Sequence, residues 1–153
     1  RSLYVTTRRG GGVMPNHCSN RIEISGEPRD VKRVKKFLQG KERCFDFNNI
    51  LPIPEELENT LVPVPDPETF KNRRLRKLYG TDNWYDWKKS KWGTKWNSYN
   101  GKIDDENEEY IVYLFDTAWS PPEPVIHALR EKFEEISITA FFDEPGMEIA
   151  GYY

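Results

Sequence analysis

The sequence has little of what several classes of protein require. Its two cysteines, Cys18 and Cys44, are too few for a disulfide framework, and neither belongs to a C-x-x-C pair typical of zinc or redox sites. The two histidines, His17 and His127, do not complete a set of ligands at the spacing of a zinc site. We therefore expect structural thiols, and neither a bound metal nor another cofactor.

The chain also lacks a long apolar segment and a secretory signal. No run approaches the roughly 20 apolar residues of a membrane-spanning helix, and no segment combines a basic start, an apolar middle and a small-residue cleavage site. A glycine-rich phosphate loop, a G-x-S-x-G turn and an H-E-x-x-H helix are absent as well. These absences favour a cytoplasmic protein with no membrane partner, and they lend little support to catalysis.

Length and composition indicate one domain with a modest core. The chain has 153 residues, of which 37% are hydrophobic and 14% aromatic, so tryptophan, tyrosine and phenylalanine are expected to anchor that core. Residues 1–13 have no sustained periodicity and precede Met14. We expect them to be a tag or an upstream extension, and the domain to occupy residues 14–153.

Hydrophobic periodicity predicts an alternation of strands and helices. Polar–apolar alternation or apolar runs predict strands at residues 20–25, 44–50, 110–115 and 136–142. Helical spacing predicts helices at residues 28–39, at residues 69–81, and after Ser120 as N-cap, the last with the apolar stripe Val125, Ile126, Leu129 and Phe133. Residues 97–108 are polar and are predicted to be a loop, within a long insertion at about 54–108. This order favours an α+β, ferredoxin-like fold (βαβ-insertion-βαβ), with an antiparallel sheet and two helices on one face.

The stretch Asn83 to Trp96, NWYDWKKSKWGTKW, concentrates indole rings and positive charge. It holds four of the five tryptophans and four lysines. Tryptophan is costly to expose, and so many rings in one short segment are hard to bury in a single core. The segment therefore predicts an aromatic, cationic surface or pocket; the alternative is a surface insertion whose tryptophans pack back onto the domain.

Charge is divided along the chain. Residues 71–101 carry nine basic residues against two acidic ones, whereas residues 102–153 carry three basic residues against thirteen acidic ones. Opposed fields of this kind can steer an anionic partner toward the basic side. Solvated charge without any partner is the alternative interpretation.

Several blocks of sequence resemble one known family. They are MPNHCSN (14–20), FDF (45–47), WYDW (84–87), WGTKW (92–96), FDTAWSPP (115–122) and EPG (144–146). The chain from Met14 to about Gly151 is similar in these blocks to the YubB-like, ferredoxin-like family of phage and plasmid proteins. The resemblance implies the same fold and an origin in a mobile genetic element, and it implies no activity.

The predicted fold brings the Trp-rich insertion to the end of the strand at residues 110–115. We expect one pocket there that offers π faces, a lysine, a carboxylate and hydroxyls. Its residues would be Trp84, Trp87, Trp92, Thr94, Lys95, Trp96, Asp116, Thr117 and Trp119. Because bases stack on tryptophan and lysine meets phosphate, this set suits a nucleotide or single-stranded nucleic acid. Alternatively, Lys95 and Asp116 pair beneath the tryptophans and only hold the insertion to the sheet.

Two further functions compete with this hypothesis. The acidic C-terminal third, including Asp104, Asp105, Glu106, Glu108 and Glu109, would suit a basic surface of a host protein. A hydrolase would use Asp116, Asp86 or His17 as acid or base near Lys95. The sequence favours binding without turnover, because it contains no catalytic motif.

Overall fold

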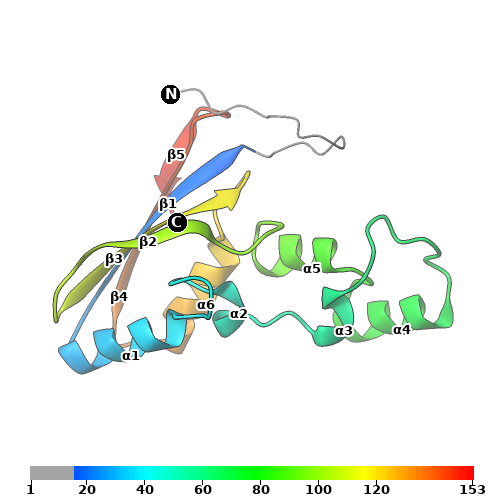
Figure 1. The fold of residues 1–153 in the computed structure, drawn as a ribbon, viewed down its shortest axis with the longest axis horizontal. Coiled ribbons are helices and arrows are strands. Elements are labelled where there is room, and N and C mark those ends of the chain that lie inside the picture. Colours follow the sequence, from blue (N-terminus) through cyan, green and yellow to red (C-terminus); the bar gives the residue numbers. More distant parts are fainter. Residues whose placement is uncertain (1–15) are drawn as a thin grey trace.

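The computed structural model describes residues 16–153, so the expectations for Met14 and residues 1–13 lie outside this range. Figure 1 shows a sheet with helices beneath it and a helical lobe beside it. The strands are β1 (His17–Ser25), β2 (Tyr99–Glu106), β3 (Tyr110–Ala118), β4 (Ser137–Glu144) and β5 (Ile149–Tyr152). The helices are α1 (Pro28–Leu38), α2 (Phe47–Ile50), α3 (Glu55–Glu58), α4 (Phe70–Tyr79), α5 (Trp84–Lys91) and α6 (Glu123–Lys132).

The sheet has the strand order β2-β3-β1-β4-β5, and all its pairs are antiparallel. Its first four strands, together with α1 and α6, follow the strand-helix-strand-strand-helix-strand order of a ferredoxin-like domain. Both of these helices lie on the same face of the sheet (Figure 1). The predicted α+β, ferredoxin-like fold is thereby confirmed.

Buried and exposed residues alternate along β1, so that one face of the strand points toward the helices. Ile22 and Ile24 are buried, whereas Arg21 and Glu23 between and beside them are exposed. The buried set meets the apolar stripes of α1 and α6 in one cluster, to which α1 contributes Val31, Val34 and Leu38, and α6 contributes Val125, Ile126 and Leu129. The helical stripes predicted for both segments are therefore confirmed.

The opposite face of the sheet carries a mixture of charge and apolar area, and no helix of residues 16–153 covers it (Figure 1). Arg21 and Glu23 of β1 lie there beside Leu114 and Val112 of β3. Phe141 of β4 pairs with Tyr152 of β5, their ring centroids 5.3 Å apart.

The strand predicted at residues 44–50 is wrong, because the segment turns into α2. The carboxylate of Asp46 caps that helix by accepting a hydrogen bond from the backbone N–H of Asn48 at 3.0 Å. Phe45 and Phe47 still enter the core, where they contact each other edge to face. Two buried phenylalanines separated by one polar residue thus give the alternating pattern of a strand, although the polar residue is the N-cap of a helix.

The loop predicted at residues 97–108 is also wrong, since β2 lies there. This strand is at the edge of the sheet and is almost entirely exposed, so the hydrophobic pattern of a strand is missing. Its pairing with β3 contains register shifts that interrupt the alternation further. The insertion consequently lies between α1 and β2, at residues 39–98, instead of at about 54–108. The short edge strand β5 was not predicted at all.

The predicted N-cap of α6 is wrong as well. The structure places Pro122 at the cap, with no side-chain cap hydrogen bond. The hydroxyl of Ser120 instead donates to the backbone oxygen of Gly93 at 2.6 Å. Ser120 therefore ties the insertion to the sheet and does not cap the helix.

The insertion forms a lobe of α3, α4 and α5 beside the sheet (Figure 1). The helix predicted at residues 69–81 is confirmed as α4, which ends at Gly80 in the left-handed conformation (φ 78°). Arg74 of α4 bonds Glu56 of α3 at 2.7 Å. The lobe contributes Leu57, Leu75 and Trp87 to the core cluster.

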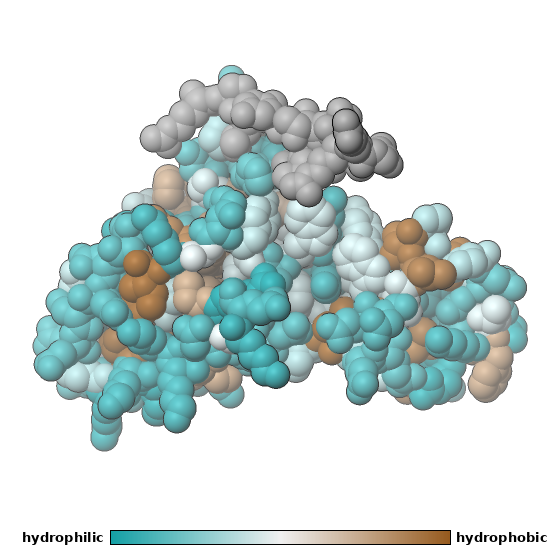
Figure 2. Space-filling model, viewed as in Figure 1, coloured by the Kyte–Doolittle hydropathy of each residue, from teal (hydrophilic) through white to brown (hydrophobic). Residues whose placement is uncertain are grey.

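None of the helices described in residues 16–153 is both long and apolar enough to cross a membrane. The face shown in Figure 2 is mostly hydrophilic, with separate hydrophobic groups.

Candidate functional site

Two indoles of the Trp-rich segment attach the insertion to the core. Trp87 is 6% exposed and Trp92 is fully buried. Their rings meet edge to face with centroids 5.8 Å apart, and Trp92 also contacts Phe47. The indole N–H of Trp92 donates to the backbone oxygen of Leu51 at 2.8 Å. These rings are structural, as the packing alternative proposed for this segment requires.

Gly93 then turns the chain toward the sheet. Its φ of 77° lies in the left-handed region, and a Cβ added there would be 2.8 Å from Cδ of Pro124. Only glycine meets both demands without strain. The next residue, Thr94, is buried and donates its hydroxyl to the backbone oxygen of Ala118 at 2.9 Å. The segment 93–96 therefore lies at the end of β3.

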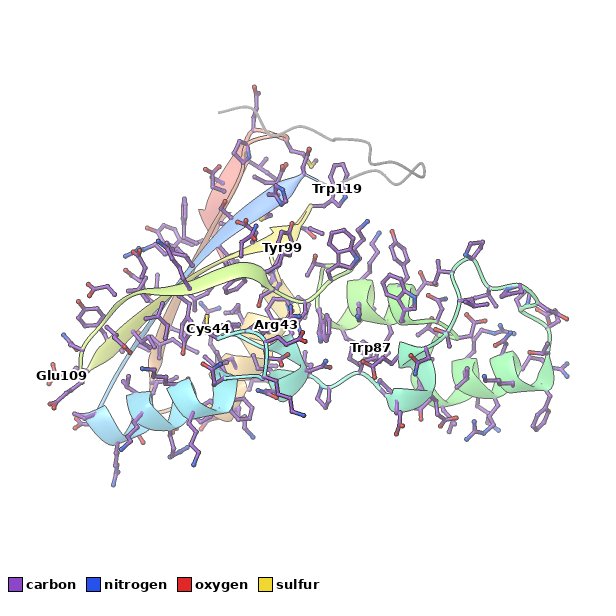
Figure 3. All side chains as sticks on the ribbon, viewed as in Figure 1. Arg43, Cys44, Trp87, Tyr99, Glu109 and Trp119 are labelled. Atoms are coloured by element: carbon purple, nitrogen blue, oxygen red, sulfur yellow. The ribbon has the colours of Figure 1, made fainter. Side chains whose placement is uncertain are left out.

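Three elements of the sheet meet at this place. β1 and β2 both run antiparallel to β3, so their first residues lie beside its last ones. His17 pairs with Ala118, and Tyr99 pairs with Asp116. Figure 3 shows Tyr99 and Trp119 toward the upper end of the sheet, next to the start of the helical lobe.

Trp119 presents its indole in a strained backbone conformation. Its φ is 69°, although it is a bulky residue, and its side chain is 40% exposed. A left-handed conformation costs such a residue on the order of 1 to 3 kcal/mol, and such strain is concentrated at functional sites. The turn is held from several sides, because Asn16, Thr94 and Thr117 all bond its backbone.

A second exposed indole lies next to a lysine. Trp96 is 36% exposed, and Nζ of Lys95 lies 4.6 Å from its ring centroid. The other neighbour of Trp96 is Tyr99, whose ring is 6.2 Å away edge to face. The Tyr99 hydroxyl in turn bonds Nδ1 of His17 at 2.7 Å. We call Lys95, Trp96, Tyr99, His17 and Trp119 the indole surface.

Charge at this surface is arranged so that the lysine stays unpaired. No carboxylate of residues 16–153 lies within 4.0 Å of Lys95. Asp116 lies nearby but bonds Ser19 at 3.4 Å and Asn100 at 3.1 Å. The Lys95–Asp116 pair considered from the sequence is therefore not present. Burial, reinforced by Asp116, raises the pKa of the Tyr99 phenol, so this hydroxyl remains protonated.

The structure divides the nine residues predicted to share one pocket. Lys95, Trp96 and Trp119 belong to the indole surface, with Asp116 at its border. Thr94 and Thr117 are buried and hold the turn beneath it. Trp87 and Trp92 lie in the core, and Trp84 lies on α5, where Lys88 covers its ring at 5.2 Å.

Sequence reasoning missed Tyr99 and gave His17 a different role. Tyr99 stands in a polar segment interpreted as a loop, and its position three residues after Trp96 was the one available signal. His17 was considered only as a metal ligand or an acid or base. Pairing of β1, β2 and β3 brings both residues to the surface, and the sequence does not predict that pairing.

The metal and hydrolase alternatives considered above involve His17, Asp86 and Asp116. His17 belongs to the indole surface, and Asp116 lies at its border. No group of three or more His, Cys, Asp or Glu side chains in residues 16–153 could hold a metal ion. Asp86 lies in the first turn of α5 and accepts a hydrogen bond from Asn83 at 3.0 Å. It is therefore a helix-terminal carboxylate, occupied by its cap residue.

The comparisons with known proteins agree on the fold. Residues 91–153 match a family model described as the ferredoxin-like domain in Api92-like protein. The crystal structure of protein api92 from Yersinia pseudotuberculosis is similar, with a TM-score of 0.59 and 12% identity over 90% of this chain and 93% of that chain. No curated protein matches the chain. At so low an identity the likeness shows a shared fold and nothing about activity.

Proposed function

We propose that the protein binds an anionic aromatic ligand, either a nucleotide or single-stranded nucleic acid, at the indole surface. The observation that carries this proposal is Trp119, which exposes a large ring from a strained turn. Thr94, the neighbour of Lys95 in the chain, bonds that turn at Ala118. Neither strain nor indole exposure stabilises the free protein, so an external partner is their simplest explanation.

The chemistry of the surface suits bases and phosphates together. A base that stacks on an aromatic ring gains roughly 1 to 3 kcal/mol irrespective of its identity. The structure places no aromatic ring or cation of residues 16–153 over Trp119, so a base can stack there. Lys95, together with Lys89 and Lys91 of α5, supplies positive charge with no carboxylate of the described residues within 4.0 Å.

We further propose that the protein acts by binding without turnover, in the cytoplasm, and that it belongs to a phage or plasmid. The resemblance of the sequence blocks motivates this assignment of origin, and the fold is compatible with it. The absence of a catalytic motif from the sequence motivates the non-enzymatic role.

Oligonucleotide binding by Trp119→Gly tests the ligand proposal. Glycine adopts a φ of 69° without strain, so this variant loses the ring and keeps the turn. We expect a fluorescein-labelled oligothymidylate to bind the variant roughly 5- to 150-fold more weakly than the wild type, measured by anisotropy. The control is Phe70→Ala, which removes an exposed ring from the start of α4.

Salt dependence completes the test. Wild-type affinity should fall between about 50 mM and 200 mM salt, because lysines release counterions from the phosphates. Equal affinity of Trp119→Gly and the wild type, or wild-type binding that is indifferent to salt, would contradict the proposal.

A second candidate function uses the uncovered face of the sheet. Among residues 16–153, Asp104, Asp105, Asp116 and Asp143 lie on or beside this face with Glu23, and the basic residues paired with them there are Arg21 and Lys102. We propose, as the alternative, that a host protein with a basic surface docks there. A stoichiometric host protein that co-purifies without nucleic acid, and is lost with Asp104→Asn/Asp105→Asn but retained with Glu131→Gln on α6, would favour this function.

A further inference from the structure

A cavity lies where the insertion meets the ferredoxin-like core. It has a volume of about 760 Å³ and is lined by the loop after α1, by α2, and by residues of α3 and α5. Figure 3 shows Arg43 in this region, lower in the view than Tyr99 and beside α2. The cavity is separate from the indole surface, because none of the five residues of that surface lines it.

The wall of this cleft is rigid. Gly40 donates its backbone N–H to the oxygen of Arg43 at 2.9 Å and closes the loop after α1. A Cβ on Gly40 would lie 2.2 Å from Oδ2 of Asp46, so the loop and α2 are in direct contact. Asn97 joins the third side, since its side chain bonds both the carboxylate of Asp46 and the backbone N–H of Phe47. Hydrogen bonds and close contacts thus join three sides of the cleft.

Three cations and three carboxylates line this cleft: Lys41, Arg43 and Lys88, and Glu42, Asp46 and Glu58. Arg43 and Lys88 have no carboxylate of residues 16–153 closer than 3.8 Å. Lys88 is half-buried between Trp84 and Trp92, 5.2 and 5.1 Å from their ring centroids, and has no carboxylate of residues 16–153 within 4.0 Å. Arg43 donates to the backbone oxygen of Ser98, and its one ion pair is 3.8 Å long, to the largely exposed Glu42. Burial lowers the pKa of Lys88, and the charge of Arg43 lowers it further although Glu58 opposes the change. Arg43 and Lys88 are less exposed than Lys41. Two partly buried cations without a close carboxylate partner can hold an oxyanion.

Other groups in the cleft suit hydroxyls. Glu58 is exposed at its edge, and its carboxylate makes no ion pair or hydrogen bond with residues 16–153. Asn48 accepts from the backbone N–H of Ile53 at 3.1 Å, and its amide nitrogen has no partner among the described residues. An acceptor and a donor beside two cations favour a ligand that carries hydroxyls as well as an anionic group.

We propose that this cleft binds a small phosphorylated polyol, with the phosphoryl oxygens at Arg43 and Lys88 and the hydroxyls at Glu58 and Asn48. Phosphate carries more charge and more acceptor oxygens than a carboxylate, which matches two cations of different geometry. The site is independent of the proposed nucleic-acid function.

Titration calorimetry with ribose 5-phosphate tests the site. The informative variant is Lys88→Met, because methionine keeps apolar contact with both indoles and removes the charge. We expect it to bind ribose 5-phosphate roughly tenfold or more weakly than the wild type. The matched control is Lys89→Met, whose lysine lies 5.3 Å from the ring centroid of Tyr85 and does not line the cleft. Arg43→Gln should weaken binding similarly and guards against a folding defect in the first variant.

The outcomes separate the parts of the proposal. Ribose without phosphate should not bind, and inorganic phosphate should bind more weakly than the ester. Equal binding of the ester by Lys88→Met and Lys89→Met, or no binding by the wild type, would overturn the site; phosphate binding as tight as the ester would overturn the polyol assignment. These results are distinct from a failure of the nucleic-acid proposal, which is measured with oligothymidylate and Trp119→Gly.

Discussion

Trp119 shows how one residue can be placed against its own preference. Its backbone N–H donates to the oxygen of Asn16, and the preceding residue, Ala118, accepts a hydrogen bond from Thr94 of the insertion. The ring gains only partial burial, because 40% of the side chain remains exposed. The sequence predicted tryptophans at this end of the sheet, but exposure of an individual ring depends on backbone geometry that composition does not encode.

The strain at Trp119 is measurable by comparing two truncations. Trp119→Gly and Trp119→Ala both remove the ring, but alanine retains a Cβ in a left-handed conformation. We expect the free energy of unfolding of the glycine variant to exceed that of the alanine variant by about 1 kcal/mol, measured by urea denaturation. A more stable alanine variant would show that the turn is relaxed at this position.

Tyr113, in contrast to the exposed Trp119, buries a polar hydroxyl that has no hydrogen-bond partner among the described residues. This hydroxyl is inaccessible, and burial raises its pKa. Tyr113→Phe should raise the free energy of unfolding by roughly 1 kcal/mol, because an unsatisfied hydroxyl is removed at nearly constant shape. Thermal and chemical denaturation would measure the change. A destabilised phenylalanine variant would indicate a partner for the hydroxyl, such as a buried water.

Cys18 should make the free energy of unfolding depend on pH in the alkaline range. Its thiol is fully buried, and burial raises its pKa from the ordinary value of 9.0 to about 12. Above pH 9 the unfolded chain therefore releases this proton while the folded chain keeps it, so the free energy of unfolding falls as pH rises toward 12. Cys18→Ala should show a shallower loss of stability over this range. Identical slopes for the two proteins would contradict this protonation state.

Among the elements, α5 and the turn after it determine how the insertion meets the sheet. Trp87 and Trp92 bury its inner side, and Gly93 redirects the chain to the end of β3. The concentration of indoles in this segment is evident from the sequence. Their attachment to Phe47 and Leu51 is not, because it depends on α2, which the sequence suggested to be a strand.

Substitution of two glycines with the same backbone conformation distinguishes the cost of backbone strain from the cost of overpacking. Gly80 and Gly93 have φ values of 78° and 77°, but a Cβ meets nothing within 4 Å at Gly80 and lies 2.8 Å from Pro124 at Gly93. Gly80→Ala should lower the free energy of unfolding by about 1 kcal/mol, and Gly93→Ala by about 2 to 4 kcal/mol because overpacking is added. Thermal denaturation of both variants checks this order. Equal losses would mean that α6 moves away from the turn at little cost.

The success of prediction for the elements follows their burial. β1, β4, α1 and α6 each bury one face, and their periodicity is visible in the sequence. The predicted helix α4 is the exception, because Leu75 is its one buried residue. β2 and β5 lie at the edges of the sheet, where few side chains are buried, and neither was predicted. Hydrophobic patterning therefore predicts the centre of the sheet, whereas edge strands are specified by pairing.

Over the whole molecule, the division of charge along the chain becomes a division in space. The lysines of α5 lie in the lobe and beside the indole surface, whereas many carboxylates of the C-terminal third lie on the uncovered sheet face. The sequence predicts one pocket at the end of β3, whereas the structure divides the residues named for it between the surface there and the core. The sequence did not predict the cleft of Arg43 and Lys88, because the lining residues of this cleft come from four separate segments.

The central claim is that the exposed indoles, and not the buried ones, meet the ligand. The most direct measurement is a titration with oligothymidylate followed by the ¹H–¹⁵N signals of the five tryptophan indoles, assigned by substitution. We predict that the signals of Trp96 and Trp119 shift on binding, while those of Trp87 and Trp92 stay in place because their rings are in the core. No shift at Trp96 and Trp119, or shifts confined to the buried indoles, would contradict the account.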